Sequence, residues 1–153
     1  MILANEKLHA RIRLSSIEPT ELIDDILQLS AGSPKICPHF HIPLQSGDPQ
    51  ILKKMNRPYS PYFFKSLIEK VYQFLPHAAI GVDVMVGFPG ETDEAFAHTA
   101  HLVESLPISY LHVFPYSRRQ LTPASKFPDQ IEPDVIKSRF NILRQISRKK
   151  KEQ

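Results

Sequence analysis

The chain has 153 residues, 42% of them hydrophobic and 23% charged, which is enough apolar material for one soluble globular domain. No apolar stretch is long enough to span a membrane, and no basic segment followed by an apolar one opens the chain, so we expect a cytoplasmic protein. The single cysteine, Cys37, excludes an internal disulfide and any zinc or iron–sulfur site that needs several cysteines from these residues.

The formal net charge of +3 is unevenly distributed along the chain. Residues 1–132 carry twelve Lys and Arg against fourteen Asp and Glu, whereas residues 133–153 carry seven against two. The basic excess therefore belongs to the C-terminal segment. Such a segment either contacts a polyanion or forms a solvated helix end, and the charge pattern leaves both readings open.

Four short apolar runs alternate with longer segments of helical spacing, which is typical of a parallel α/β sheet. The runs cover residues 10–17, 36–44, 79–88 and 109–116. A closed barrel of eight strand–helix units needs about 250 residues, so four strands supply about half of one. We expect a partial parallel (βα) barrel in residues 1–132, followed by a basic C-terminal helix in residues 133–153. An open, right-handed four-stranded sheet is the alternative.

Capping residues and prolines bound the predicted helices. The first runs from Pro19 to Gly32, and later helices begin after Asp48, Ser60 and Thr92. No Gly-x-Gly-x-x-Gly turn for a dinucleotide is present.

Functional groups in parallel α/β folds gather at the carboxyl ends of the strands. All four ends are polar or glycine-rich, at residues 15–18, 45–48, 87–91 and 116–119. One such junction alone is more simply explained as a turn, but four together indicate a site. The two glycines of the turn 87–91 allow a ligand to approach the backbone, and Glu91 either holds a polar ligand group or complements the following helix N-terminus.

Alternation along the second run places His39, His41, Pro43 and Gln45 on one face of a strand, which we expect to face the barrel interior. Two histidines at this spacing can bind a metal, but no further His or Asp occurs at a comparable strand start, so an interior hydrogen-bonded pair is favoured. Asp83 lies inside the third run, where we expect it to meet a hydroxyl, such as a ribose hydroxyl, an amide or a basic side chain.

The last segment carries basic residues at helical spacing. Lys137, Arg144, Arg148 and Lys151 should form one stripe, opposite the apolar side chains Ile136, Phe140 and Leu143. The stripe either follows a phosphate backbone or is a solvated outer face.

Four segments together resemble one known family, the radical S-adenosylmethionine methylthiotransferases. They are RIRLSSIEP (11–19), CPHFHIPLQSGDPQILKKMNRPY (37–59), DVMVGFPGETDEAF (83–96) and LHVFPYSRRQLTPA (111–124). Within the family, RLSSIEP and HVFPYS resemble the branch that acts on N6-threonylcarbamoyladenosine beside the tRNA anticodon. The resemblance extends from about residue 10 to residue 150.

The resemblance implies a partial (βα)6 barrel with S-adenosylmethionine across its strand ends, ligating a [4Fe-4S] cluster. Reductive cleavage then produces a deoxyadenosyl radical, which takes hydrogen from adenine C2, and a second cluster assists addition of a methylthio group to the tRNA. The family's cluster cysteines are not among these residues. We therefore expect a fragment that is inactive alone and needs an N-terminal half, supplied by another chain or lost.

Carried over by position, Ser16, Gln45 and Ser46 would line the cofactor pocket, and the turn 87–91 would match the family motif that packs against adenine. Cys37 matches a family cysteine that is not a cluster ligand, and Leu121 stands where the family usually has glycine, so a left-handed backbone there would be strained. From the strand ends and the resemblance together, the residues predicted to bind the cofactor are Ser16, Glu18, His41, Gln45, Ser46, Asp83, Gly87, Phe88, Pro89, Gly90 and Glu91.

Of three candidate functions, a catalytic metal bound by His39 and His41 is the least favoured, and two others remain in competition. The first is a fragment of a tRNA methylthiotransferase. The second is a non-catalytic RNA-binding module that uses the basic helix, which in the family leads to a small RNA-binding β-domain absent from these residues.

Overall fold

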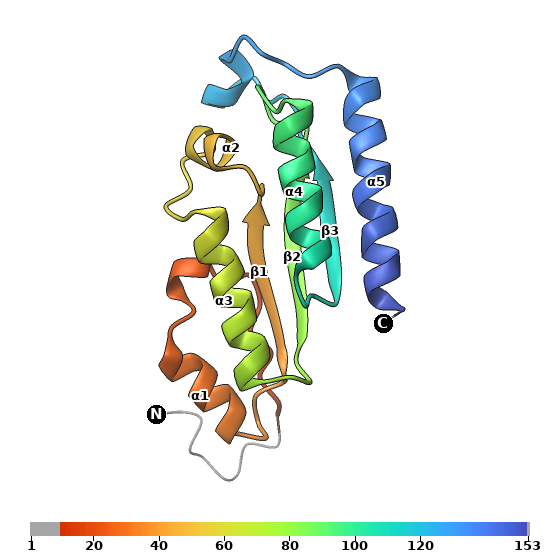
Figure 1. Cartoon of the computed structure of the whole chain (residues 1–153). Coiled ribbons are helices and arrows are strands. Elements are labelled where there is room, and N and C mark those ends of the chain that lie inside the picture. The colour runs from red at the N-terminus through yellow and green to blue at the C-terminus, as the bar shows by residue number, and fades with distance from the viewer. Residues whose placement is uncertain (1–9, 153) are drawn as a thin grey trace.

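The computed structural model describes residues 10–152, so the part of the predicted first unit before residue 10 lies outside it. Three parallel strands form one sheet in the order β1-β2-β3 (Figure 1). The strands are β1 (His39–Gln45), β2 (Ala79–Val86) and β3 (Tyr110–Pro115). The helices are α1 (Asp24–Gly32), α2 (Pro49–Lys54), α3 (Pro61–Phe74), α4 (Asp93–Ser105) and α5 (Pro133–Lys151). The predicted α/β class with parallel strands is confirmed.

The first predicted strand, residues 10–17, is reduced to one parallel bridge between Ile12 and Ile36. The run still lies beside β1, because the Ile17 N–H donates to the His41 carbonyl over 3.0 Å. Ser16 takes a left-handed backbone with φ of 54°, which interrupts the extended path that a regular ladder requires. The segment therefore occupies the place of a fourth strand without its regular hydrogen bonds.

Helix starts after Asp48, Ser60 and Thr92 are confirmed, since each side chain accepts a hydrogen bond from a backbone N–H of its own helix. The predicted start at Pro19 is wrong. Residues Pro19–Glu21 form a single 3-10 turn, and α1 begins only at Asp24. Between them Leu22 leaves the helical region to bury its side chain in the core, so tertiary packing overrides the proline signal.

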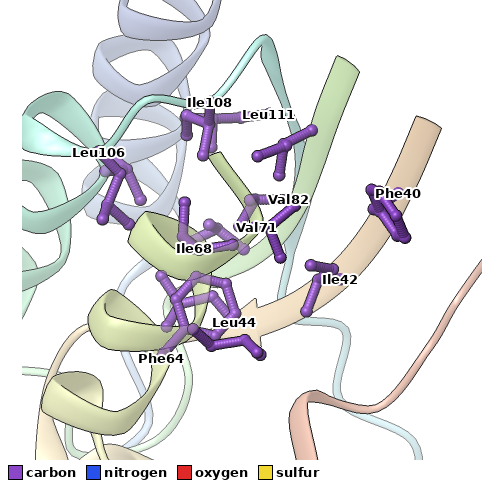
Figure 2. Packing of buried hydrophobic residues seen from close by; sticks show 14 of the residues in the cluster. Phe40, Ile42, Leu44, Phe64, Ile68, Val71, Val82, Leu106, Ile108 and Leu111 are labelled. Atoms are coloured by element: carbon purple, nitrogen blue, oxygen red, sulfur yellow. The ribbon is translucent and has the colours of Figure 1, made fainter. Parts of the chain in front are cut away.

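The core lies between one face of the sheet and the helices. Alternation along β1 sends Phe40, Ile42 and Leu44 to this face, where each is fully buried; all three are labelled in Figure 2. The side chains of α3 that meet the sheet are Phe64, Ile68 and Val71. α5, which packs beside β3, adds Leu143 and Ile146, so the basic C-terminal helix contributes to the main core. Within residues 10–152, no helix has both the length and the apolar composition to cross a bilayer.

Replacing Leu143 by alanine should lower the free energy of unfolding by about 2–5 kcal/mol, because its fully buried side chain leaves a cavity between α5 and the sheet. The neighbouring Ile142, which is 42% exposed on the same helix, is the matched control. Its alanine variant should change stability by less than about 0.5 kcal/mol. Equal losses in chemical denaturation would show that α5 is not docked as described.

Candidate functional site

Left-handed backbone conformations gather at the carboxyl edge of the sheet. Within residues 10–152, five residues have positive φ, and four of them, Ser16, Gln45, Gly87 and Gly90, are at strand ends selected from the sequence. For the non-glycine residues such a conformation costs on the order of 1–3 kcal/mol and persists only where the surroundings enforce it. Backbone strain at Ser16 and Gln45 therefore marks this edge as the candidate site.

A cavity of about 330 Å³ opens at this edge. Its volume lies at the lower end of the range for small-molecule sites. Side chains from the ends of β1 and β2, from the loop after α2 and from the 3-10 helix Pro123–Lys126 surround it. The lining residues are Gln45, Lys54, Met55, Asn56, Arg57, Met85, Phe88, Thr122, Pro123, Ala124 and Phe127.

The cavity combines an aromatic wall with a cationic rim. The ring of Phe88 meets Tyr116 and Phe127 edge to face, with centroid distances of 5.5 and 6.2 Å. Lys54 and Arg57 supply the positive charge, and Arg57 donates to Glu18 over 3.1 Å. Glu18 thus reaches the site through Arg57, which joins the irregular first strand to the loop after α2. Such a wall and rim can hold a flat ring at one end of a ligand and an anionic group at the other.

Ser46 is fully buried, and its hydrogen bonds lead away from the cavity. Its Oγ accepts from the Asp48 N–H over 3.1 Å and lies 3.3 Å from Thr99 Oγ1, which also accepts from the Gly47 N–H. Gly47 has no room for a Cβ, because an ideal one would lie 2.6 Å from the Thr99 Cα. These contacts pin the end of β1 to α4, so Ser46 shapes the backbone beside Gln45.

Asp48 caps α2 with its Oδ1 and contacts the His98 Nδ1 with its Oδ2 at 3.0 Å. Burial raises the pKa of this carboxyl, but the His98 imidazole and the two capping N–H groups outweigh burial and hold the pKa below its usual value. The ionised form is therefore the one that the folded chain holds.

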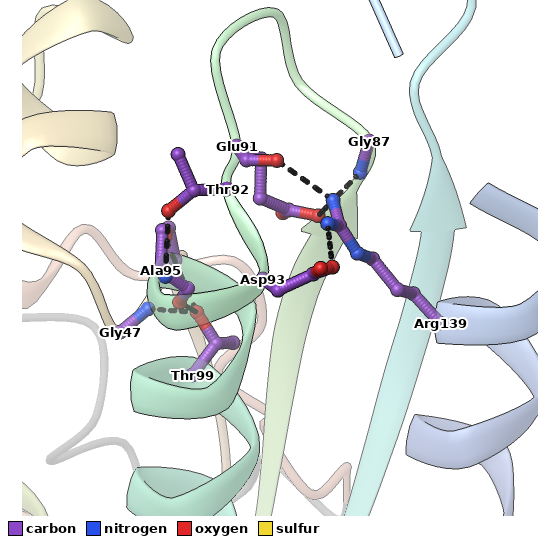
Figure 3. A network of polar contacts seen from close by, with 9 residues as sticks. Gly47, Gly87, Glu91, Thr92, Asp93, Ala95, Thr99 and Arg139 are labelled. Atoms are coloured by element: carbon purple, nitrogen blue, oxygen red, sulfur yellow. Dashed lines mark hydrogen bonds and ion pairs between the residues drawn. The ribbon is translucent and has the colours of Figure 1, made fainter. Parts of the chain in front are cut away.

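The turn Gly87–Glu91 is tied to α5 through a buried ion pair (Figure 3). Glu91 Oε1 accepts from the Gly87 N–H at 3.1 Å and from Arg139 Nη1 at 2.7 Å. Burial raises the pKa of Glu91, and the Gly87 N–H and the Arg139 guanidinium oppose that rise. Phe88 and Pro89 are buried within the same turn, and only Phe88 of these two lines the cavity.

His41 lies about 13 Å before the end of β1 and Asp83 about 10 Å before the end of β2, on the face opposite the helices. His41 Nε2 is 2.6 Å from Asp83 Oδ1, and His112 Nδ1 is 3.6 Å from the same oxygen. Of the three kinds of partner expected for Asp83, the structure shows the basic side chain, which is His41. His39 instead bonds Arg13 and the Tyr110 hydroxyl.

The expectation that no third ligand approaches His41 is wrong, since β2 and β3 bring Asp83 and His112 to it. The sequence missed His112 because strand register sets its position. The distances nevertheless fit a hydrogen bond better than a metal. Two ligands on one tetrahedral ion lie about 3.3 Å apart, and 2.6 Å between His41 and Asp83 is much shorter.

Cys37 lies before β1, at the opposite end of the strand from the cavity. Leu121 is fully exposed, and within residues 10–152 positive φ at non-glycine residues is confined to Ser16, Gln45 and Asn56. Leucine at position 121 is therefore accommodated without left-handed strain. Asn56 also has a left-handed backbone, which was not predicted from the sequence although asparagine tolerates this conformation better than most residues.

A second hollow, of about 390 Å³, runs between β3 and α5. Arg144, Arg148 and Lys151 line it together with Phe114 and Phe140. Lys137 lines the neighbouring hollow, which also includes Phe140. The expected placement of Phe140 opposite the stripe is wrong, because its ring lies 5.5 Å from the Arg144 guanidinium, one helical turn away on the same side.

Replacing Asp48 by asparagine should destabilise the fold at pH 7 by about 1 kcal/mol, because the amide keeps the cap but loses the charge facing His98. Since the pKa of Asp48 is lower in the folded chain than in the unfolded chain, the stabilisation is present above the unfolded pKa and disappears as the pH falls through the folded pKa. Unfolding curves of wild type and variant should therefore converge in acid. Asp25→Asn, at an exposed position in the first turn of α1, is the control and should show no such convergence.

Comparisons with known proteins connect this geometry to a family. The model of the Radical SAM superfamily matches residues 1–103. A tRNA-2-methylthio-N(6)-dimethylallyladenosine synthase of Mycobacterium marinum is 45% identical over 133 residues, covering 87% of this chain and 25% of that protein. A threonylcarbamoyladenosine tRNA methylthiotransferase of Bacillus subtilis is 43% identical over 137 residues, covering 90% of this chain and 30% of that protein. The chain thus spans between a quarter and a third of these relatives.

Among solved structures, coproporphyrinogen III oxidase of Escherichia coli, described as a radical SAM enzyme, superposes with a TM-score of 0.70 at 24% identity. The match covers 90% of this chain and 32% of that enzyme, and it shows a shared fold. The resemblance to tRNA methylthiotransferases read from the sequence motifs is confirmed by the relatives. The chain belongs to the Radical SAM superfamily.

Proposed function

We propose that residues 1–132 are the part of a tRNA methylthiotransferase barrel that holds S-adenosylmethionine, and that the basic helix in residues 133–153 receives the tRNA. The observation that carries the proposal is the cavity at the strand ends, bounded by the strained Gln45 on β1 and by Phe88 of the turn that begins at the left-handed Gly87. Strain of this kind is maintained where a ligand needs a pre-formed backbone.

The lining residues fit the parts of S-adenosylmethionine. The Phe88 ring offers a face or edge to the adenine, the Gln45 amide can pair with its polar edge, and Arg57 or Lys54 can pair with the carboxylate. When bound, this cofactor supplies a deoxyadenosyl radical on reductive cleavage. The residues described here orient it and exclude water from one side. The set proposed from the sequence is Ser16, Glu18, His41, Gln45, Ser46, Asp83, Gly87, Phe88, Pro89, Gly90 and Glu91, and of these Gln45 and Phe88 line the cavity.

The [4Fe-4S] cluster does not fit these residues. Cys37 is the single cysteine, and it lies eight residues before Gln45, about 26 Å away along an extended strand. One thiolate at the wrong end of the sheet cannot hold a cluster at the cavity. The cluster thiolates of the proposed enzyme therefore come from outside residues 1–153, on the same or a separate polypeptide.

The proposed substrate is a tRNA that carries N6-threonylcarbamoyladenosine. The segments RLSSIEP and HVFPYS support this branch, and the Bacillus subtilis relative carries that nucleoside in its name. Most of the similar relatives are instead named for dimethylallyladenosine. A comparison of tRNA substrates with the two nucleosides is therefore needed to test this part of the proposal.

The hollow beside β3 supports α5 as the tRNA contact. Three cations and two aromatic rings share it, a combination that suits a phosphate backbone with a base stacked beside it. The same feature supports the second candidate function, an RNA-binding module without catalysis. The two differ in whether the strand-end cavity binds S-adenosylmethionine.

Equilibrium dialysis with labelled S-adenosylmethionine tests the cavity. Gln45→Ala and Phe88→Ala should each weaken binding by about tenfold, because they remove a polar and an aromatic contact at the cavity wall. Tyr62→Ala, at an 80% exposed position on α3, should bind like the wild type. Binding that is indifferent to both cavity variants would contradict the proposed site and leave the RNA-binding module as the better function.

Charge reversal of Arg144 and Arg148 should weaken binding of an anticodon stem–loop RNA and make the slope of log K against log salt shallower by about two, one for each lost phosphate contact. Lys65→Glu with Lys70→Glu on α3 is the matched reversal away from the hollow. Stem–loops with threonylcarbamoyl- and dimethylallyladenosine should be compared, and tighter binding of the first is expected. An unchanged slope in the Arg144/Arg148 variant rules out this hollow as the RNA contact.

A further inference from the structure

Arg139 is the only buried Lys or Arg in residues 10–152, with 5% of its surface exposed. The basic residues of α5 that line the hollows beside β3 are exposed, and Arg139 points inward from the same helix. Removing a guanidinium from water is costly unless each of its donors finds an acceptor. The hydrogen-bond acceptors of Arg139 therefore identify the part of the molecule that this residue holds in place.

Arg139 donates its hydrogen bonds to Glu91, the last residue of the turn Gly87–Glu91, and to Asp93, the first residue of α4 (Figure 3). Nη1 donates to the Glu91 carbonyl oxygen at 2.8 Å and to Glu91 Oε1 at 2.7 Å, and Nη2 donates to Asp93 Oδ1 at 2.7 Å. The guanidinium also lies 5.4 Å from the centre of the Phe96 ring. Asp93 is 99% exposed, so water screens its pairing, and the buried contacts to Glu91 dominate.

Glu91 passes this restraint on to the start of the turn. The same Oε1 that pairs with Arg139 accepts from the Gly87 N–H, and Gly87 holds a φ of 77°. One helical turn before Arg139, Ile136 packs so closely on Gly87 that an ideal Cβ would lie 2.4 Å from its Cγ1. Two successive turns of α5 thus contact the turn Gly87–Glu91, one by packing and one through the carboxylate.

The ion pair is not arranged for stability alone. Glu91 Oε2 is buried and has no hydrogen-bond partner within residues 10–152, so half of the carboxylate is unsatisfied. Well-packed apolar side chains often stabilise a fold as well as a buried ion pair does. What the pair adds is direction, because one nitrogen, Nη1, donates to both the carbonyl and the carboxylate of Glu91, while Nη2 donates to Asp93 at the start of α4.

We propose that Arg139 is a positioning residue that reaches from the basic helix to hold the turn Gly87–Glu91 in its left-handed shape, and thereby sets the affinity of the strand-end cavity for its ligand. Phe88 is carried by this turn and lines the cavity, so a shift of the turn moves a wall of the site. The identity of the ligand, S-adenosylmethionine, rests on the proposed function. The restraint on the turn does not.

The test compares Arg139→Gln and Arg139→Lys with Ser147→Ala in the full chain. Ser147 is the matched control, because its buried hydroxyl docks the same helix by bonding the Leu111 N–H and carbonyl of β3 at 2.9 and 3.1 Å, away from the turn. Amide hydrogen exchange at Gly87 and the dissociation constant of S-adenosylmethionine are measured well below the melting temperature of each variant. Both readouts report on folded protein.

Arg139→Gln should accelerate exchange at Gly87 by about tenfold and weaken S-adenosylmethionine binding by about fivefold. Arg139→Lys keeps the charge and should recover part of both, and it decides the matter if the glutamine variant does not fold. Ser147→Ala should lower the melting temperature while leaving both readouts unchanged.

Unchanged exchange at Gly87 in the Arg139 variants overturns the proposal, and so does faster exchange with undiminished affinity for S-adenosylmethionine. If the wild-type chain binds no S-adenosylmethionine, the proposed cofactor role fails. The exchange measurement then still decides whether Arg139 positions the turn.

Discussion

Hydrogen bonding between β1 and β2 and between β2 and β3 keeps the three strands parallel, and this register sets the positions of the polar side chains on the sheet. Alternation sends Phe40, Ile42 and Leu44 beneath the helices, so the histidines of the same strand are left on the opposite face. Because the strands share one direction, their polar ends arrive at one edge. The cavity forms there as a consequence of strand direction, and its strained Gln45 is held by neighbours that the ladder has already fixed.

Features that depend on a few adjacent residues could be predicted from the sequence. The caps Asp48, Ser60 and Thr92 bind N–H groups two or three positions away, so their signals are local. The alternation of β1 and the glycine turn after β2 are local as well. Pro19 shows the limit of such signals. The proline predicts a helix start, but the burial of Leu22 interrupts the helical backbone, and α1 begins only at Asp24.

The rest of the candidate site depends on contacts between distant positions. Asp83 meets His112 only because strand register aligns them, and the 3-10 helix Pro123–Lys126 reaches the cavity across a loop with no periodic pattern. Arg139 and Glu91 are 48 positions apart, and although the spacing of Arg139 from Leu143 places it on the apolar side of the helix, no local pattern names Glu91 as its partner. The strand-end residues could therefore be predicted from the sequence. The 3-10 helix over the cavity, the cationic rim and the contact of Arg139 with the turn Gly87–Glu91 could not.

The hydroxyl of Ser147 stands where a neighbouring strand would otherwise be, since it serves both the donor and the acceptor of Leu111 at a margin of the sheet that no strand in residues 10–152 extends. Unpaired margins of this kind invite a second molecule to add its own strand. A second molecule would first have to displace α5 from this edge. A second copy of the chain would also place its own lysines and arginines against those of the first, and like charges repel. α5 therefore disfavours self-association through the β3 edge of the sheet.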